Sequence, residues 1–206
     1  MRLNLGACDD IRPGWCNVDR VKLPGVEVVM DLAEPWQFAD STVDEIYAAD
    51  IFEHIGDCLH IGAQICDRCY RPRRGGASGC QICGMMPCYE GNMYCKIRHW
   101  SGRVHTMNEA HRVLKPGGIL RMECPDAAQG CGQWQDPTHV SAWTPNGLQY
   151  FEDGSPAHRR FAAAYGITAR FKILILKERN YFDLAGGPGG LRCEVWKFAA
   201  VLEAVK

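Results

Sequence analysis

Four cysteines in the middle of the chain are spaced as ligands of one metal ion. Cys66-x2-Cys69 and Cys80-x2-Cys83 are separated by ten residues in the stretch "CDRCYRPRRGGASGCQIC" (66–83). Each pair can bind an ion from a tight turn, and together they supply the four thiolates that zinc prefers. Because such a site has no open position, the spacing predicts a structural zinc ion. Disulfides, an iron–sulfur cluster or free thiols are the alternatives.

A second and looser set of metal-ligating residues follows these pairs. Cys88, Cys95 and His99 have the spacing Cys-x6-Cys-x3-His. A fourth ligand would come from one of three further residues: Cys58, His60 or His105. This set leaves a second zinc ion as an open alternative.

Three carboxylates stand where short apolar runs end. Asp19 ends "PGWCNVD", Asp31 follows "VVM" and Asp50 ends "IYAAD". In an open parallel sheet, ligands bind beyond the carboxyl ends of the strands, so these groups would share one edge. Singly, each could be a turn former or a helix cap. Together they suit a ligand with a ribose, an exocyclic amine and a positive charge, and they suit a polyphosphate poorly.

The elements that must position these groups form an α/β pattern. The predicted strands are "RLNLG" (2–6), "VEVVMD" (26–31), "VDEIYAAD" (43–50), "GILRMEC" (118–124), "FKILILK" (171–177) and "CEVWKFAAV" (193–201). Helices are predicted in "HTMNEAHRVLKPGG" (105–118) and "PAHRRFAAAYG" (156–166), which end at glycines. The last two strands are expected to be antiparallel, joined by a loose Gly-rich connection.

Residues 57–104 interrupt this pattern. They are rich in Cys, Gly and Arg and show neither helical nor strand periodicity. With few large aliphatic residues, such a segment needs a staple to fold. The sequence therefore predicts a single domain over 1–206 that contains a zinc-stapled insertion at 57–104.

Composition limits the class of protein. The chain has 206 residues, of which 47% are hydrophobic and 23% charged, and a formal charge of −1. These values give no electrostatic reason to expect binding to membranes or nonspecific binding to nucleic acid. No leader-like segment is present, so a cytoplasmic location is expected. The remaining cysteines are expected to be small buried hydrophobes: Cys8, Cys16, Cys124, Cys131 and Cys193.

Three segments resemble, in order, those of class I S-adenosylmethionine-dependent methyltransferases. They are "LNLGACDDIRPGWCNVD", "DLAEPWQFADSTVDEIYAADIFEHI" and "NEAHRVLKPGGILRMECPD", and "DPTHVSAWTPNGLQYF" (136–151) is similar to a later segment of a small methyltransferase-11-like subgroup. The resemblance covers about residues 2–55 and 105–200. It implies a Rossmann-like sheet, mostly parallel with a C-terminal antiparallel hairpin.

The resemblance also implies which residues hold S-adenosylmethionine. Leu5, Gly6 and Ala7 would form the cofactor loop and Asp19 would hold the ribose. The remaining implied contacts are Asp31 with Leu32 beside the adenine and Asp50 beside the cofactor. The chain departs from the family at Cys8, where a second glycine is usual, and in a connection to Asp19 so short that the first helix is reduced to a turn.

Two histidines are candidates for the acceptor side of a methyl transfer. His54 follows the strand that ends at Asp50, and His139 lies in "DPTH", where Asp136 could orient it. A sulfonium methyl is already activated, so alignment does most of the work, and a base helps if the acceptor is a hydroxyl or a protonated amine. His139, His54 and Asp136 are therefore the predicted catalytic residues.

The predicted function is O- or N-methylation of an unidentified acceptor, with the insertion shaping access to it. A small molecule is favoured as acceptor. One alternative is a non-catalytic zinc-containing binding module on a degenerate methyltransferase fold. The other is a nucleic-acid methyltransferase, which the near-neutral charge and the absence of Asp-Pro-Pro-Tyr-like and Pro-Cys motifs disfavour.

Overall fold

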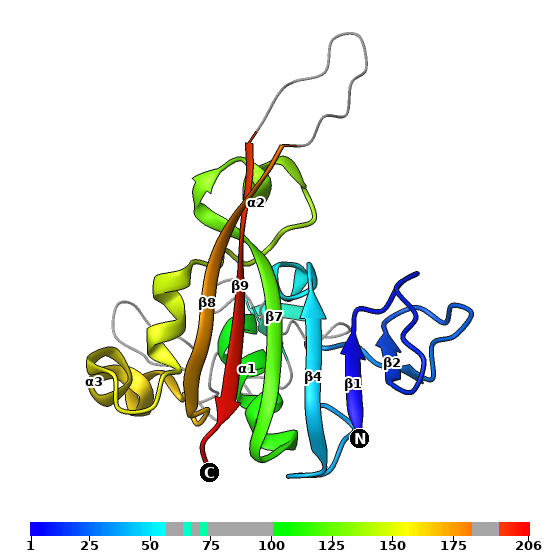
Figure 1. Cartoon of the computed structure of the whole chain (residues 1–206), viewed down its shortest axis with the longest axis horizontal. Helices are drawn as coiled ribbons and strands as arrows, with labels where there is room; N and C mark the ends of the chain where they lie inside the picture. The colour runs from blue at the N-terminus through cyan, green and yellow to red at the C-terminus, as the bar shows by residue number, and fades with distance from the viewer. Residues whose placement is uncertain (57–63, 67–70, 74–100, 183–193) are drawn as a thin grey trace, which may run out of the picture.

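A computed structural model describes residues 1–56, 64–66, 71–73, 101–182 and 194–206. Its main feature is a seven-stranded sheet in the order β3-β2-β1-β4-β7-β9-β8 (Figure 1). The strands are β1 (Arg2–Leu5), β2 (Cys16–Asp19), β3 (Val28–Val29), β4 (Val43–Ala49), β7 (Leu114–Gly130), β8 (Phe171–Phe182) and β9 (Glu194–Ala204). The first five of these pair in parallel, whereas β9 is antiparallel to both β7 and β8.

The helical elements are short and few among the described residues. They are η1 (Phe52–His54), α1 (Gly102–Val113), α2 (Gly132–Gln135), η2 (Pro145–Tyr150) and α3 (Pro156–Tyr165). A separate antiparallel hairpin pairs β5 (Gln64–Cys66) with β6 (Arg71–Arg73). None of the described helices is long and apolar enough to span a membrane.

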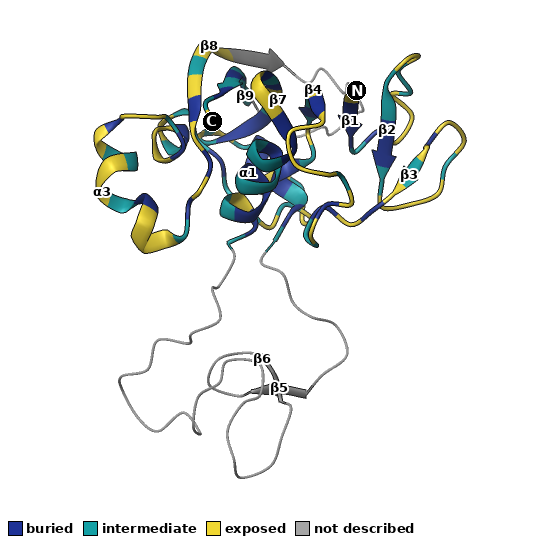
Figure 2. Cartoon of the chain, turned by 90° about the horizontal axis from the view of Figure 1, so that it is seen from below, coloured by how far each residue is buried: buried dark blue, intermediate teal, exposed yellow. Residues whose placement is uncertain are grey.

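The core lies between the sheet and α1, where the buried positions gather (Figure 2). Met107, Ala110 and Val113 are fully buried and form an apolar stripe along one side of α1. Leu3, Leu5, Ile46, Leu120, Leu202 and neighbouring strand residues complete this core. The mostly parallel sheet with its antiparallel C-terminal hairpin confirms the predicted fold class.

The boundaries of several elements differ from the sequence prediction. Helix α1 begins at Gly102, three residues before the predicted start at residue 105. Strand β2 was not among the predicted strands, since "CNVD" is too short and polar to show a strand period. Strands β8 and β9 pair as far as Phe182 opposite Glu194, so the connection between them is shorter than the predicted loop. Cross-strand hydrogen bonds, which periodicity does not reveal, extend this hairpin.

The five cysteines outside the insertion were expected to be small buried hydrophobes, and this expectation is only partly met. Cys124 is buried as predicted, but Cys16 is only partly buried and Cys8 is exposed. Cys131 is disulfide-bonded and so is not a simple buried hydrophobe. Cys193 lies outside the described residues.

The backbone and packing at position 6, directly after β1, require a glycine. Its φ is +67°, a conformation that L side chains rarely adopt, and a Cβ there would lie 2.6 Å from Ile51 Cγ1. The absence of a side chain lets the chain turn sharply and pass close to the end of β4. This brings the loop after β1 next to the segment that carries η1.

Gly6→Ala should therefore lower the free energy of unfolding by about 2–4 kcal/mol, the sum of a left-handed backbone cost and a steric clash. Gly154→Ala is the matched control, because Gly154 has φ +74° but no atom within 4 Å of the added Cβ. That control should lose only about 1–2 kcal/mol. Equal losses in urea denaturation of the two variants would show that the contact with Ile51 imposes no constraint.

Candidate functional site

The parallel strands bring the predicted acidic residues to one edge of the sheet. Asp19 ends β2, Asp31 lies two residues after β3, and Asp50 directly follows β4. This edge, at the carboxyl ends of β1 and β4, is at the top in Figure 1. Asp31 and Asp50 are exposed and Asp19 is partly exposed, so a ligand could reach all three. The arrangement is that of a ligand edge in an open α/β sheet.

Asp19 also organises the loop after β1. Its Oδ2 accepts a hydrogen bond from the Cys8 backbone N–H at 3.0 Å, and its Oδ1 accepts one from the Val21 N–H at 2.9 Å. Cys8 has φ +42°, so a non-glycine residue holds the left-handed conformation in which glycine is favoured. The departure from the family's second glycine therefore changes the side chain at this position, while the backbone keeps a glycine-like conformation.

Two buried asparagines stabilise the connection between β1 and β2, which has turns where the family has its first helix. Asn4 Nδ2 donates to Asn17 Oδ1 at 2.9 Å and to the Asp10 carbonyl at 2.7 Å. Asn17 Oδ1 also accepts from the Arg12 N–H at 3.0 Å. These bonds satisfy the backbone of a connection that forms only turns, as the short spacing predicted. Sequence reasoning did not single out either asparagine, because each lies inside a strand pattern.

At the end of β4, Asp50 pairs with a lysine of β9, which is separated from β4 by β7. Lys197 of β9 donates through Nζ to Asp50 Oδ2, and this ion pair raises the pKa of Lys197 against the opposing effect of its burial. Asp50 has φ +50° and its N–H donates to the Glu123 carbonyl of β7 at 3.0 Å. The sequence prediction missed Lys197, since only the inserted antiparallel β9 brings it to this edge.

Glu53, in η1, is the most unusual side chain at this edge. Its side chain is completely buried, and neither carboxylate oxygen has a hydrogen-bond partner of good geometry among the described residues. Burial raises the pKa of Glu53 to about 7, helped by the negative charge of Asp50 and opposed by Lys197 and the Cys124 thiol. An unpaired buried carboxylate is costly, so its presence needs an explanation.

The structure brings the three predicted catalytic residues together around Glu53. His139 Nε2 lies 4.0 Å from Glu53 Oε1 and 3.7 Å from Asp136 Oδ2. The rings of His54 and His139 meet edge to face, with centroids 4.7 Å apart. His54, His139 and Glu53 each present a ligand atom within 4.8 Å of the others. Glu53 is the member of this cluster that the sequence prediction did not include.

The segment that follows α2 holds His139 against η1. The backbone N–H groups of Val140 and Ser141 both donate to the Glu53 carbonyl at 2.9 Å. Ser141 Oγ donates to the Phe52 carbonyl at 2.9 Å, and Trp143 packs on Phe52 with ring centroids 5.8 Å apart. Because these contacts fix both elements, the cluster is preorganised by the core and does not depend on exposed side chains alone.

The predicted zinc ligands are not part of this cluster. Cys66 ends β5, and its side chain is not described. The others lie outside the described residues: Cys69, Cys80, Cys83, Cys88, Cys95 and His99.

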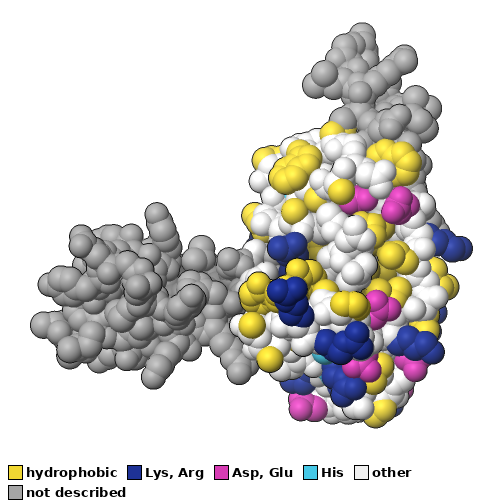
Figure 3. All heavy atoms as spheres, turned by 90° about the vertical axis from the view of Figure 1, so that its left-hand side faces the viewer, with side chains coloured by type: hydrophobic (Ala, Val, Ile, Leu, Met, Phe, Trp, Pro, Cys, Tyr) yellow, Lys and Arg dark blue, Asp and Glu magenta, His cyan; other side chains and the backbone are white. Residues whose placement is uncertain are grey.

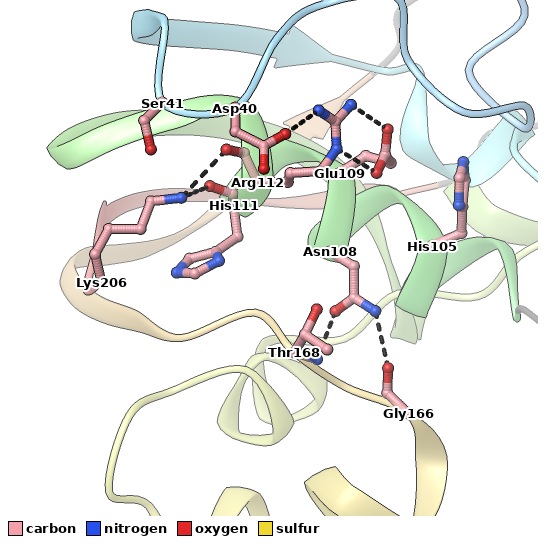
Figure 4. Close-up of a pocket in the computed structure, with 10 residues that line it drawn as sticks. All are labelled: Asp40, Ser41, His105, Asn108, Glu109, His111, Arg112, Gly166, Thr168 and Lys206. Atoms are coloured by element: carbon pink, nitrogen blue, oxygen red, sulfur yellow. Dashed lines mark hydrogen bonds and ion pairs between the residues drawn. The ribbon is translucent and has the colours of Figure 1, made fainter.

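A hollow of about 510 Å³ lies along α1, away from the acidic edge (Figure 4). Asp40 and Ser41, which precede β4, and Lys206, which follows β9, place it toward the opposite edge of the sheet. Its polar groups largely bond to one another: Arg112 pairs with Glu109 at 2.7 Å and with Asp40 at 2.6 Å. Lys206 donates to the His111 and Arg112 carbonyls. The bonds of Lys206 hold the C-terminus against α1. The lining of this hollow, as described, does not contain a cluster of metal-ligating side chains like that around Glu53.

Comparison with known proteins supports the fold. No family model matches the chain, and no curated protein matches it in sequence. Among solved structures, a candidate methyltransferase from Bacillus halodurans aligns with a TM-score of 0.54 and 11% identity, over 100% of this chain and 92% of the other. The YcgJ protein from Bacillus subtilis aligns with a TM-score of 0.51 and 11% identity, over 100% and 91%. A SAM-dependent methyltransferase from Archaeoglobus fulgidus gives 0.49 and 10%, over 98% and 85%.

These identities are low, so the alignments with TM-scores above 0.5 establish the fold and leave activity open. The chain has the Rossmann-like fold of class I methyltransferases, as the sequence segments predicted.

Proposed function

We propose that the protein transfers the methyl group of S-adenosylmethionine to an acceptor bound beside Glu53, His54, Asp136 and His139. The observation that carries this proposal is the position of that cluster. It lies directly after β4, next to the edge where Asp19, Asp31 and Asp50 stand. A cofactor edge and a group of proton-binding side chains therefore adjoin in the fold of methyltransferases.

The residues at the edge fit the proposed cofactor. Gly6 turns the chain at the end of β1 with φ +67°, packed so closely on Ile51 that no side chain fits there. Asp19 keeps lone pairs for two ribose hydroxyls, since each of its oxygens accepts only one backbone N–H bond in the structure. Leu5 and Ala7 flank the glycine, and Leu32 is a buried apolar neighbour of Asp31 suited to the adenine face. Asp19 and Asp31 give this edge a negative charge that attracts a sulfonium ion, and Asp50 lies beside them in its ion pair with Lys197.

The acceptor side of the site assists proton removal. Bound S-adenosylmethionine supplies a methyl group that is already activated by its positive sulfur. The chain therefore has to align the acceptor and take up its proton, for which Asp136, His54 and His139 are close together. Thr138 bonds hold Asp136 and lower its pKa, so this carboxyl stays ionised as a proton-accepting or orienting group. We propose an O- or N-acceptor of small size.

We further propose that residues 57–104 shape access to the acceptor, with a structural zinc ion bound by Cys66, Cys69, Cys80 and Cys83. The supporting observation is where this segment joins the sheet. Gly102, at the start of α1, packs so closely on the loop after His54 that a Cβ there would lie 2.3 Å from the Gly56 carbonyl oxygen. Both ends of the segment therefore meet beside the acceptor cluster. Cys88, Cys95 and His99 remain the ligands proposed for a second ion.

Asp19→Ala should weaken binding of S-adenosylmethionine at least tenfold in isothermal titration calorimetry. Each lost hydrogen bond to a charged acceptor is worth about 1.5–3 kcal/mol, and freeing the Cys8 N–H adds a looser loop. Asp40→Ala, at the opposite edge of the sheet, is the control and should bind as the wild type does. An unchanged dissociation constant in Asp19→Ala would place the ribose elsewhere, and no binding by the wild type up to millimolar concentration would refute the proposed function.

A further inference from the structure

Glu53 has the features of a metal ligand. Its carboxylate is fully buried, neither oxygen has a hydrogen-bond partner of good geometry in the described part of the chain, and it faces the Nε2 atom of His139 at 4.0 Å. A side chain kept only for packing would be apolar or would be hydrogen-bonded, because desolvating a carboxylate costs several kcal/mol. Lys197, whose charge acts on Glu53, is hydrogen-bonded to Asp50.

The hydrogen bonds around the histidines fix which ring nitrogens are free. His139 Nδ1 lies 3.0 Å from the Gln133 carbonyl oxygen, so it must carry the proton and leave Nε2 bare. Thr138 Oγ1 gives its hydrogen to Asp136 Oδ1 at 2.6 Å. It can only accept from His54 Nδ1, 3.1 Å away, as the Thr138 carbonyl does at 3.3 Å. The Nε2 lone pairs of both histidines are therefore available.

We propose that Glu53, His54 and His139 bind one divalent transition-metal ion, with Asp136 as a fourth ligand. The metal site itself does not depend on methyl transfer, whereas its role in catalysis rests on the proposed function. Imidazole nitrogens mixed with carboxylates suit Mn²⁺, Fe²⁺, Co²⁺ or Zn²⁺ better than Mg²⁺ or Ca²⁺, which prefer oxygen ligands alone.

The geometry needs only small side-chain rotations. Ligand atoms about 2.0–2.2 Å from an ion lie within about 4.4 Å of one another. The three ligand atoms here already lie within 4.8 Å of each other, and His139 Nε2 is 3.7 Å from Asp136 Oδ2. The Gln133 and Thr138 carbonyls occupy the outer positions that orient metal-bound histidines through Nδ1. The site therefore has both its ligands and the groups that hold them.

With the ion bound, His54, His139 and Asp136 would act as its ligands instead of taking up the proton directly. The ion would bind the acceptor hydroxyl and lower its pKa, so that its proton passes to solvent. The acceptor oxygen would then form a bond to the methyl carbon as the sulfur–methyl bond breaks. Its electron pair returns to sulfur, and the sulfonium becomes a neutral thioether. This role of the ion is that of a Lewis acid positioned at the acceptor.

Cobalt separates this site from the proposed thiolate sites of the insertion. Metal-stripped full-length protein should be titrated with Co²⁺ and followed by visible absorption. Thiolate-bound Co²⁺ gives an intense near-ultraviolet charge-transfer band, which nitrogen and oxygen ligands do not produce. We expect one equivalent that adds visible d–d absorption without increasing the charge-transfer band.

Variants assign that equivalent to the cluster. His139→Ala and Glu53→Gln should lose it or weaken its affinity at least 100-fold, and His54→Ala should do the same. Thr138→Val, which removes the Oγ1 contacts to both His54 Nδ1 and Asp136 Oδ1, should weaken it about 10–100-fold. His158→Ala is the control, since His158 lies on α3 and contacts the Ala169 carbonyl. It should bind Co²⁺ like the wild type.

Two results would overturn the proposal: no thiolate-free equivalent in the wild type, or one that persists unchanged in both His139→Ala and Glu53→Gln. Glu53→Gln guards against a trivial loss of fold, because it is close in shape to the native residue. S-adenosylmethionine titrations of the same variants separate the two proposals. Cofactor binding without the Co²⁺ site would refute the metal alone, and the Co²⁺ site without cofactor binding would refute the methyltransferase function.

Discussion

The free energy of unfolding of the metal-free wild type should fall by about 2–3 kcal/mol between pH 5 and pH 8 because of Glu53, and this fall should be absent in Glu53→Gln. Burial raises the pKa of Glu53 from 4.5 to about 7. The folded state therefore favours the protonated carboxyl more than the unfolded state does. The stability that this provides is fully present below pH 4.5 and is lost as the pH rises through 7, at about 1.4 kcal/mol per pH unit.

The comparison isolates Glu53 from its titratable and charged neighbours, which are Asp50, Lys197, Cys124 and His139 and which both proteins share. Urea denaturation of wild type and variant at the two pH values gives the difference directly. Glu203→Gln, which neutralises a partly exposed carboxylate of β9, is the control and should follow the wild type. If Glu53→Gln also tracks the wild type at both pH values, Glu53 is not desolvated in the folded protein.

Cys66→Ser combined with Cys69→Ser should release one equivalent of zinc and make residues 57–104 sensitive to protease. Cys66 pairs with Arg71 in the antiparallel β5–β6 hairpin, whereas Cys69 lies outside the described residues. A structural zinc ion supplies about 10–16 kcal/mol of apparent binding energy, and the segment has few apolar residues to replace it. Binding of S-adenosylmethionine should survive, because Gly6, Asp19 and Asp31 lie on other connections.

Elemental analysis and limited proteolysis test this prediction. Cys16→Ser removes a thiol of β2 outside the segment and should keep both the metal and the protease resistance. No metal in wild-type protein purified without chelator, or wild-type proteolysis of the double variant, would remove the zinc ion from the account.

The face formed by β8 and α3 carries both exposed hydrophobic and charged side chains. In Figure 3 hydrophobic side chains there are interspersed with charged ones. The exposed hydrophobic residues include Leu174, Ile175 and Leu176 on the edge strand β8, and Tyr165 on α3. Because Lys172, Lys177 and Glu178 interrupt the strand's surface, the edge carries charges of the kind that oppose self-association.

Local patterns were enough to predict most of the fold. The strands around Leu3, Ile46 and Leu120 are buried apolar runs, and α1 carries the stripe that includes Met107 and Ala110. Strand β2 was missed because Asn17 is a buried polar residue in the middle of four. Its stability comes from Asn4 and from pairing with β1, which are properties of the assembled sheet.

Some residues of the candidate site could be predicted from the sequence and others could not. Asp19, Asp31 and Asp50 could be predicted to share an edge, because they follow parallel strands. Glu53 and Lys197 could not, since burial of a carboxylate and insertion of β9 beside β7 depend on tertiary packing. The signal for Glu53 was its place in "FEH", directly between an apolar residue and a candidate catalytic histidine.

A crystal structure with S-adenosylhomocysteine would show where the cofactor binds. We expect its ribose hydroxyls bonded to Asp19, its adenine beside Asp31 and Leu32, and its sulfur near Gly6 and Asp50. The sulfur should face the cluster of Glu53, His54 and His139 across the space left for the acceptor. A ligand bound at another edge of the sheet, or no ligand at saturating concentration, would contradict the proposed S-adenosylmethionine-dependent methyl transfer.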